Sequence, residues 1–355
     1  MAYTGINKSS EHFETLIYSG NASNPRTLSG LDFQPDWVWL KNRTDSNGHT
    51  LADSIRGSNV SISSDSTAAE VTNKSDGHLD AFTSNGFTVG AGGDGDARIN
   101  DDSHTYVAWN WKAGGSASSN SDGNITSSVS VNTTAGFSIV SYTGTGGGKT
   151  VGHGLGVAPR VFFMKNRGSA DYNWSVWHAD LATPTTARLA LNTTAAQANN
   201  SSYWNDGVPS ATILNLGSDA GHNANGNTYI AYCFAEKQGF SKFGSYVGTA
   251  GNNATAPFIH TGFKPAWFMV KNSNAASAWE IYDGKRNGFN PQVRQLRANE
   301  DAAEGSTDDL VDFHANGFKI RHQSTGINED GDKFIYMAFA EEPFVSGTGV
   351  PGTAR

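Results

Sequence analysis

The residues best suited to chemistry are acidic side chains in two loops. Residues 94–96 and 101–102 read Asp-Gly-Asp and Asp-Asp, and residues 329–332 read Glu-Asp-Gly-Asp. Clustered carboxylates are the oxygen ligands that Ca²⁺ prefers. However, the corresponding residues 225–227 read Asn-Gly-Asn, and both Asp-Gly and Asn-Gly are common hairpin turns. No segment matches the twelve-residue calcium loop, so the sequence favours turns, predicts no metal ligands, and leaves calcium as the alternative.

Tryptophan is the second candidate, because sugars stack on aromatic rings and the chain has nine tryptophans. Five of them lie in expected core strands. The other four are candidates for contact with a glycan or a protein partner: Trp174, Trp177, Trp204 and Trp279. Trp204 is the best candidate for an exposed ring. Packing in a core or interface is the competing interpretation for all four, and the favoured one.

Charged residues recur at related positions without forming a catalytic pattern. Asp53 with Arg56, and Asp283 with Arg286, are spaced three residues apart. We expect surface ion pairs, which contribute little to stability. Three lysines precede an asparagine at the end of an expected strand, where a lysine blunts an edge against pairing. They are Lys41, Lys165 and Lys271.

Motifs of enzymes and cofactor sites do not stand out. Residues 144–150 read Gly-Thr-Gly-Gly-Gly-Lys-Thr, which lacks the glycine spacing of a phosphate loop. Cys233, the single cysteine, lies in an expected strand, where we interpret it as packing. A glycan-cleaving enzyme would need paired carboxylates facing a cleft. The sequence therefore predicts no catalytic residue and no cofactor.

These candidates recur because a longer pattern appears three times. Residues 32–43, 156–167 and 262–272 share a proline followed by an apolar run and Lys-Asn. Two further landmarks follow each copy in the same order: an alanine signature at 67–70, 194–197 and 301–304, and a closing apolar run at 106–111, 229–234 and 334–339. The proline of each copy lies 124 and then 106 residues from the previous one, which is the size of a domain.

The repeat sets the expected domain boundaries. We expect three modules, at residues 1–113, 136–236 and 237–345. Residues 114–135 are rich in Gly, Ser, Asn and Thr and are predicted to be a linker. Residues 346–355 are predicted to be a flexible tail.

Short β-prone runs between Gly and Asn turns predict an all-β fold, with a jelly-roll-like β-sandwich in each module. Alternate side chains of a strand point to opposite faces. In the closing run, one face is large and apolar in all three copies and is predicted to point into the core: Val107, Trp109, Trp111, Ile230, Tyr232, Phe234, Ile335, Met337 and Phe339. The other face is smaller and mixed, as suits a neighbouring layer.

Composition excludes several classes of protein. The charged fraction is 16% and the net charge is −8, with no basic cluster, which argues against a nucleic-acid partner. One cysteine cannot form an intrachain disulfide. Residues 1–10 lack the features of a signal peptide, and no run approaches the roughly 20 apolar residues of a membrane helix. We therefore expect assembly in a reducing cytoplasm without membrane insertion.

The pattern resembles a repeated module of virion proteins from tailed phages, particularly phages of marine bacteria. The residues that carry the resemblance are 262–272, 33–43, 85–87 (Asn-Gly-Phe) and 106–109 (Tyr-Val-Ala-Trp). The resemblance extends over all three copies and implies a virion location, but it brings no catalytic residues. The second copy lacks Asn-Gly-Phe, so the three surfaces need not be equivalent.

The sequence thus predicts a non-catalytic virion surface protein, either a capsid decoration or a tail-attached component. Its expected partners are other shell or tail proteins, and further copies of itself in an oligomer or symmetric array. A receptor-binding tail adhesin that recognises a host glycan is the alternative, and a glycan-cleaving enzyme is the third hypothesis.

Overall fold

The computed structural model describes residues 4–306, 310–346 and 348–349. Strands dominate, as the all-β prediction requires, and the prediction is confirmed. The helices within the described part are a 3₁₀ turn, η1 (Ser9–Glu11), and three short helices, α1 (Ser201–Trp204), α2 (Ala220–Asn223) and α3 (Gly284–Asn287). None of these could cross a membrane. Apart from Ser346, Thr348 and Gly349, the expected tail lies outside the described residues.

Residues 1–113, 136–236 and 237–345 are called the first, second and third repeat below. The first contributes a large sheet in the order β1 (Phe13–Ser19), β9 (Thr105–Trp111), β3 (Trp37–Asn42), β4 (Thr50–Asp53), β5 (Gly57–Ile62) and β6 (Val71–Thr72). A small sheet packs on it in the order β2 (Arg26–Ser29), β8 (Gly86–Gly90) and β7 (His78–Thr83). Together they form a two-layered sandwich.

The second repeat follows the same plan with additions. Its large sheet has the order β10 (Ser118–Asn120), β11 (Ser127–Asn132), β12 (Phe137–Thr143), β19 (Thr228–Phe234), β14 (Val161–Asn166), β15 (Ser175–His178), β16 (Ala187–Ala190) and β17 (Ala198–Asn199). The small sheet pairs β13 (Lys149–Gly152) with β18 (Ile213–Leu216). Helix α1 lies in the part of the sequence that departs from the repeat.

The third repeat has a large sheet in the order β20 (Ser241–Val247), β27 (Lys333–Pro343), β22 (Phe263–Asn272), β23 (Glu280–Asp283) and β24 (Leu296–Arg297). Its small sheet has the order β21 (Phe258–His260), β26 (Gly317–Ile320) and β25 (Val311–His314). The register shows which positions correspond. Opposite Trp111, Phe234 and Phe339 of the closing strands lie Phe13, Phe137 and Ser241.

The expected linker is wrong in one respect, because residues 114–135 contain β10 and β11. These strands pair antiparallel and extend the second sheet beyond β12. Val129 of β11 is buried in the sandwich core of that repeat. The alternation Ser-Val-Ser-Val at 128–131 is a strand pattern, which the abundance of Gly, Ser and Asn around it obscured.

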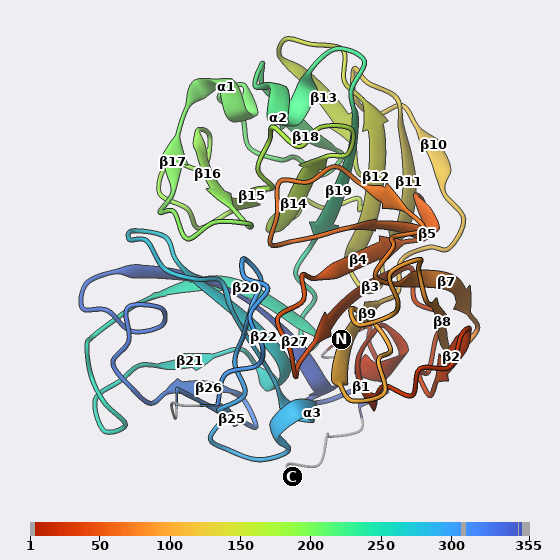
Figure 1. Ribbon diagram of the computed structural model, residues 1–355. Coiled ribbons are helices and arrows are strands. Elements are labelled where there is room, and N and C mark those ends of the chain that lie inside the picture. Colours follow the sequence, from red (N-terminus) through yellow and green to blue (C-terminus); the bar gives the residue numbers. More distant parts are fainter. Residues whose placement is uncertain (1–3, 307–309, 347, 350–355) are drawn as a thin grey trace.

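The three large sheets meet in one central core. Figure 1 shows the repeats as three lobes, the first in red to orange, the second in yellow to green and the third in teal to blue. The apolar face predicted from the closing strands points into this centre, where all nine side chains belong to one cluster. The opposite faces of these strands join three separate clusters, one inside each sandwich. Both faces of each closing strand are therefore buried.

Trp37 illustrates how the centre joins the repeats. Its indole stacks on Tyr232 of the second repeat, with ring centroids 4.3 Å apart, and lies 4.4 Å from the ring of Trp111. It also stacks on Phe137 at 5.8 Å. Trp37 is fully buried, so the first repeat alone would expose this surface to water. Burial of such rings is the main term that favours the joined structure.

We predict that Trp37→Ala lowers the free energy of unfolding by about 3–5 kcal/mol, the usual cost of truncating a buried aromatic side chain. Because its contacts belong to two repeats, unfolding should remain a single transition. Guanidinium denaturation followed by circular dichroism and by fluorescence measures both quantities. Val208→Ala, at an exposed site, should change stability by less than about 0.5 kcal/mol. Separate transitions for the repeats would contradict the prediction.

Candidate functional site

The four tryptophans that were candidates for contact with a glycan or a partner are all buried, with at most 4% of each residue exposed. Packing, the favoured interpretation, describes all four, and Trp204 is not an exposed ring. Trp204 packs against Phe162 inside the second sandwich and donates to the carbonyl oxygen of Ala187 at 2.7 Å. Trp177 stacks on the same Phe162, with ring centroids 5.6 Å apart, and belongs to the same core. These rings fill the interior and are not accessible to a sugar.

The remaining two tryptophans join repeats to one another. The indole N–H of Trp174 donates to the Ser63 carbonyl of the first repeat at 2.8 Å. That of Trp279 donates to the Ala190 carbonyl of the second repeat at 2.9 Å. His49 occupies the corresponding position in the first repeat, and its Nε2 lies 3.0 Å from a carbonyl oxygen of the third. Each of these three aromatic side chains thus binds the preceding repeat. The three repeats therefore form a closed ring.

Three segments, here called arms, carry these carbonyl groups: residues 63–70, 190–197 and 297–304. Each arm ends in the alanine signature and crosses to the next repeat around the ring. The backbone N–H at its end donates to the carbonyl of the residue that follows the Lys-Asn motif: Glu70 to Arg167 (2.9 Å), Gln197 to Ser273 (3.0 Å) and Glu304 to Arg43 (2.8 Å). Two sequence landmarks that are far apart in the chain are therefore partners in space.

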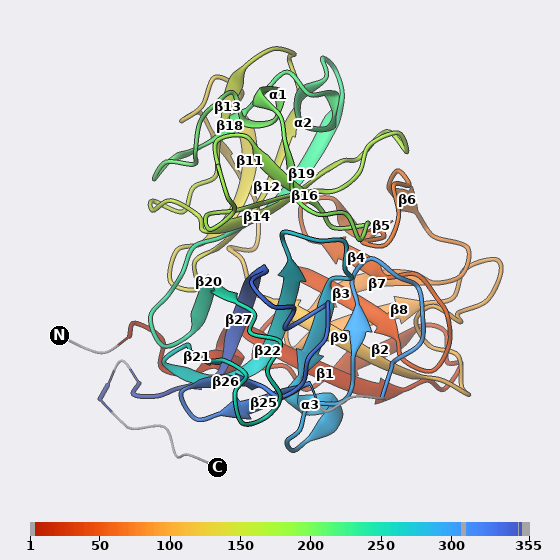
Figure 2. The ribbon, with the colours of Figure 1, turned by 90° about the vertical axis from the view of Figure 1, so that its left-hand side faces the viewer.

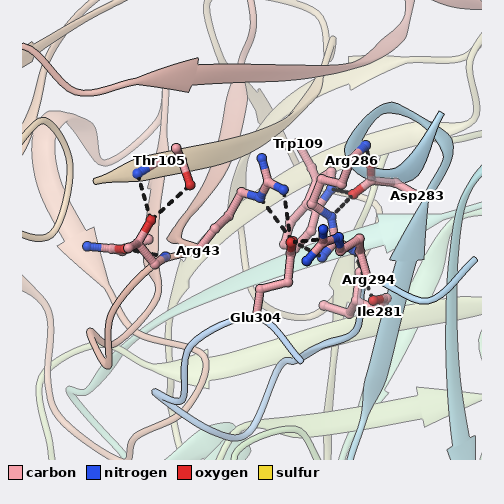
Figure 3. A network of polar contacts seen from close by, with 10 residues as sticks. Arg43, Thr105, Trp109, Ile281, Asp283, Arg286, Arg294 and Glu304 are labelled. Atoms are coloured by element: carbon pink, nitrogen blue, oxygen red, sulfur yellow. Dashed lines mark hydrogen bonds and ion pairs between the residues drawn. The ribbon is translucent and has the colours of Figure 1, made fainter. Parts of the chain in front are cut away.

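Side chains reinforce two of these three junctions. Arg167 donates to both carboxylate oxygens of Glu70, at 2.8 and 2.9 Å. Arg43 donates in the same way to Glu304, at 2.9 and 2.8 Å (Figure 3). Such two-pronged pairs are among the stronger polar contacts in proteins. The third junction joins Gln197 to Ser273, so both members of that pair are neutral.

The two Asp–Arg pairs are not on the surface, contrary to our expectation. The side chains of Asp53, Arg56, Asp283 and Arg286 have no exposed area. In each pair the aspartate accepts hydrogen bonds from the arginine side chain and from its backbone N–H. The strands that carry Asp53 and Asp283 lie against the neighbouring repeat, which removes the pairs from water. Local spacing could not reveal this burial.

Each buried aspartate also accepts a hydrogen bond from another repeat. The Tyr232 hydroxyl donates to Asp53 at 2.7 Å, and the indole N–H of Trp109 donates to Asp283 at 2.9 Å. Tyr232 and Trp109 occupy corresponding positions of their closing strands. Figure 3 shows Trp109 reaching Asp283 beside Arg286. The aspartates are thereby supplied with donors that a buried carboxylate requires.

At each of two junctions, these contacts form a continuous chain of charged side chains. Asp283 pairs with Arg286, which donates to Glu304 at 2.9 Å, and Glu304 pairs with Arg43 of the first repeat. The corresponding chain between the first and second repeats is Asp53, Arg56, Glu70 and Arg167, with Arg56 and Glu70 3.9 Å apart. Although burial opposes it, hydrogen bonding to Arg43 and the charge of Arg286 lower the pKa of Glu304.

At the junction between the second and third repeats, every corresponding position holds an uncharged residue. One of these residues is a histidine, which could take up a proton. His178, Leu181, Gln197 and Ser273 replace the Asp, Arg, Glu and Arg of the other junctions. Met337 replaces the tyrosine or tryptophan donor. His178 is buried, and burial lowers its pKa to about 4, so the ring is neutral. All partners have changed together, as buried charges require.

Lys41, Lys165 and Lys271 are also buried, so they do not blunt exposed edges as expected. Each Nζ donates to the carbonyl of the asparagine that follows it, at 2.6, 2.8 and 2.6 Å. Burial lowers the pKa of all three lysines to about 8. A lysine at the same place in three apolar strands was the available signal that these residues do more than shield an edge.

The two acidic loops are held in place by hydrogen bonds from tyrosine hydroxyls of their own repeats. The loop with residues 94–102 receives a hydrogen bond from the Tyr18 hydroxyl to the Ile99 carbonyl at 2.6 Å, and Tyr246 binds the Ile327 carbonyl of the third repeat in the same way at 2.6 Å. Asp101 caps its own turn by accepting from Ser103. Within the described residues, no group of three or more His, Cys, Asp or Glu side chains could hold a metal ion.

A family comparison covers this whole arrangement. Residues 8–343 match the family described as a domain of unknown function, DUF7483. The chain belongs to this family. The matched region spans all three repeats, in keeping with a single unit built around one core. A search of curated proteins found no match.

For this DUF7483 chain we predict that Glu70 and Arg167 are energetically coupled. Glu70→Gln and Arg167→Ser should each destabilise the fold by about 1–3 kcal/mol, because each leaves a partly buried charge without its partner. The double variant recreates the natural Gln197–Ser273 pair and should lose about 1 kcal/mol less than the sum. Urea denaturation of the four proteins measures the coupling. Strict additivity would show that the pair contributes nothing.

We also predict that the fold weakens in mild acid through its buried histidines. Burial lowers the pKa of His49 to about 4, against 6.5 for an exposed ring. Above pH 6.5 neither the folded nor the unfolded chain binds this proton. Below pH 6.5 the unfolded chain binds it first, so stability falls, by about 2 kcal/mol at pH 5 for His49, and the loss continues to about pH 4.

The check compares urea denaturation at pH 7 and pH 5. His49→Trp, which introduces the residue found at the corresponding positions of the other repeats, should reduce the difference between the two pH values. The exposed His260 provides the matched control, since His260→Gln should leave that difference unchanged. An unchanged difference in His49→Trp would contradict the assignment.

Proposed function

We propose that this chain is a non-catalytic structural protein of a phage virion, attached to the capsid or the tail, that acts through protein–protein contacts. The observation that carries the proposal is the use of the recurring polar residues. The recurring arginines and carboxylates join neighbouring repeats at two of the three junctions, and the recurring lysines bind the backbone of their own strands. The recurrent pattern is thus accounted for by architecture, as suits a structural component.

Further support comes from the resemblance to phage virion modules and from the closed form of the molecule. A ring in which each repeat binds the next presents three related outer faces from one rigid body. Contacts that are weak one by one add up when a rigid body presents several of them. A protein attached to a symmetric particle benefits from that arrangement.

The alternative, an adhesin that binds a host glycan, has lost the residues that favoured it. The four tryptophans proposed as sugar platforms are in the interior. An adhesin would have to use other residues. We therefore keep the structural role as the proposal.

The experiment is quantitative mass spectrometry of purified particles from the culture that produces this chain, measured against the major shell protein. Abundance near that of the shell protein is expected for a capsid decoration, and a few copies per particle for a tail component. Absence of the chain from the particles would overturn the proposal.

A further inference from the structure

β1, β12 and β20 occupy the same place beside the closing strand of each large sheet, and their outer sides are treated differently. In the second repeat, β11 pairs along β12. In the third, side chains cap β20, because the Phe243 N–H donates to Glu236 at 3.3 Å and the Phe243 carbonyl accepts from Arg160 at 3.4 Å. In the first repeat, β9 is the partner of β1 among the described strands, and no strand lies on its other side.

The backbone of β1 shows which groups face this free edge. Lys112 donates to the His12 carbonyl and Gly20 donates to the His104 carbonyl, each at 2.9 Å. Even-numbered residues of β1 therefore bond to β9, since bonded and non-bonded pairs alternate in antiparallel sheets. The N–H and C=O groups of Phe13, Thr15, Ile17 and Ser19 point outward, and among them the Ser19 carbonyl accepts from the Arg26 side chain at 2.6 Å. They correspond to the groups of β12 that receive β11.

A groove of about 1210 Å³ adjoins this edge, between the first and third repeats. Helix α3 lies beside β1, as Figures 1 and 2 show. Phe13, Glu14 and Thr15 line one side of the groove, and Phe289 and Gln292 line the other. Phe289 is 74% exposed, the largest exposure among the large apolar side chains of the described residues. The edge and the groove thus form one continuous surface.

Polar atoms in the groove are without partners in the described part of the chain. They are Oε2 of Glu14, Oγ1 of Thr15 and Oε1 of Gln292. Thr15 and Gln292 are more than nine-tenths buried. At the position of Thr15 the other repeats have Ile139 and Phe243, which are apolar core residues. Thr15 thus places a hydroxyl where the other repeats are apolar, and Glu14 presents its carboxylate on the opposite face of β1.

The charge of the groove also indicates the ligand. Glu14, Glu341 and Glu342 line it against Lys264 and Lys285, and Lys264 is paired with Glu341. Burial raises the pKa of Glu14 and of Glu342, and the lining holds three carboxylates against two lysines. A basic side chain on the ligand would supply the missing charge.

We propose that the free edge of β1 and the adjoining groove bind an extended segment of a partner protein, which adds an antiparallel strand to the first sheet and carries a basic side chain opposite Glu14. The chain itself provides the precedent in β11. The edge lacks lysine, proline and bulges, the devices by which proteins keep an unpaired edge from binding strands. That the partner is a virion protein rests on the proposed function, whereas the pairing does not.

The test uses the isolated chain and two synthetic peptides. One has the sequence of residues 125–133, which includes β11, and the other carries Val131→Lys. In β11, Val131 lies opposite Ser138, which corresponds to Glu14. Hydrogen–deuterium exchange is followed at the outward amides of β1. We expect either peptide to slow exchange at Phe13, Thr15 and Ile17 at least tenfold at saturation, and the lysine peptide to bind at least threefold tighter.

Two variants and a control separate pairing from charge. Ile17→Pro removes one outward N–H at a partly exposed residue and should weaken both peptides at least tenfold. Ser245→Pro, at the corresponding position of β20, should have no effect on binding. Glu14→Gln should remove the preference for the lysine peptide while leaving the other peptide unchanged, a readout that holds even if a proline variant does not fold.

Three results would overturn the proposal: no slowing at β1 with millimolar peptide, equal slowing at β20, or protection of β1 that grows with protein concentration in the absence of peptide. The last would show that a second copy occupies the edge. None of these results depends on whether the chain is found in particles, so failure here and failure of the virion proposal are distinguishable.

Discussion

The structure depends on the burial of one apolar face from each large sheet in a common centre. A β-sheet with two apolar faces needs a cover on each side. Each small sheet covers one face, and the other two repeats cover the second. No repeat can satisfy this requirement alone, which is why the residues of the centre are divided among all three. The arms and the three junctions between repeats surround this shared core.

The common centre explains why charged residues at the junctions are so completely paired. Asp53 and Arg56 are placed at the ends of strands that the centre draws against the next repeat. A charge in that position loses its water, and the loss is offset only if opposite charges and hydrogen-bond donors surround it. The tyrosine or tryptophan of the neighbouring closing strand supplies the donor, so the apolar packing and the polar chain are fitted to each other.

The sequence predicted the repeat, the β-strands and the face of the closing strand that forms the core, because these follow from local periodicity. It could not predict which local features would be buried by another repeat. The Asp–Arg pairs were predicted to lie on the surface, and Trp174 was a candidate for contact with a glycan or a partner, because each repeat was treated as an independent module. The partners that bury them lie about 100 residues away or more, and no local pattern records that distance.

The signal that could have revealed the junctions was comparison among the repeats. Glu70 and Glu304 correspond to Gln197, while Arg167 and Arg43 correspond to Ser273. The acid and the base are lost at different places in the sequence, but at one junction in space. If two landmarks are in contact, the loss of a charge from one of them favours the loss of the opposite charge from the other. The paired changes at Gln197 and Ser273 fit such a contact.

Connectivity accounts for the need for a charged junction at only one place. The second and third repeats are joined by residues 235–240, between β19 and β20, and the first and second by residues 112–117, between β9 and β10. Both pairs are therefore held at high effective concentration whatever their contacts contribute. The third repeat, in contrast, must return to the first across the whole length of the chain, and the junction that closes the ring carries an ionic network. Charge complementarity specifies a partner more strictly than apolar contact does. The charged chains at two of the three junctions thus direct the arms 63–70 and 297–304 to their partners, and the arm 190–197 reaches its place through backbone and apolar contacts.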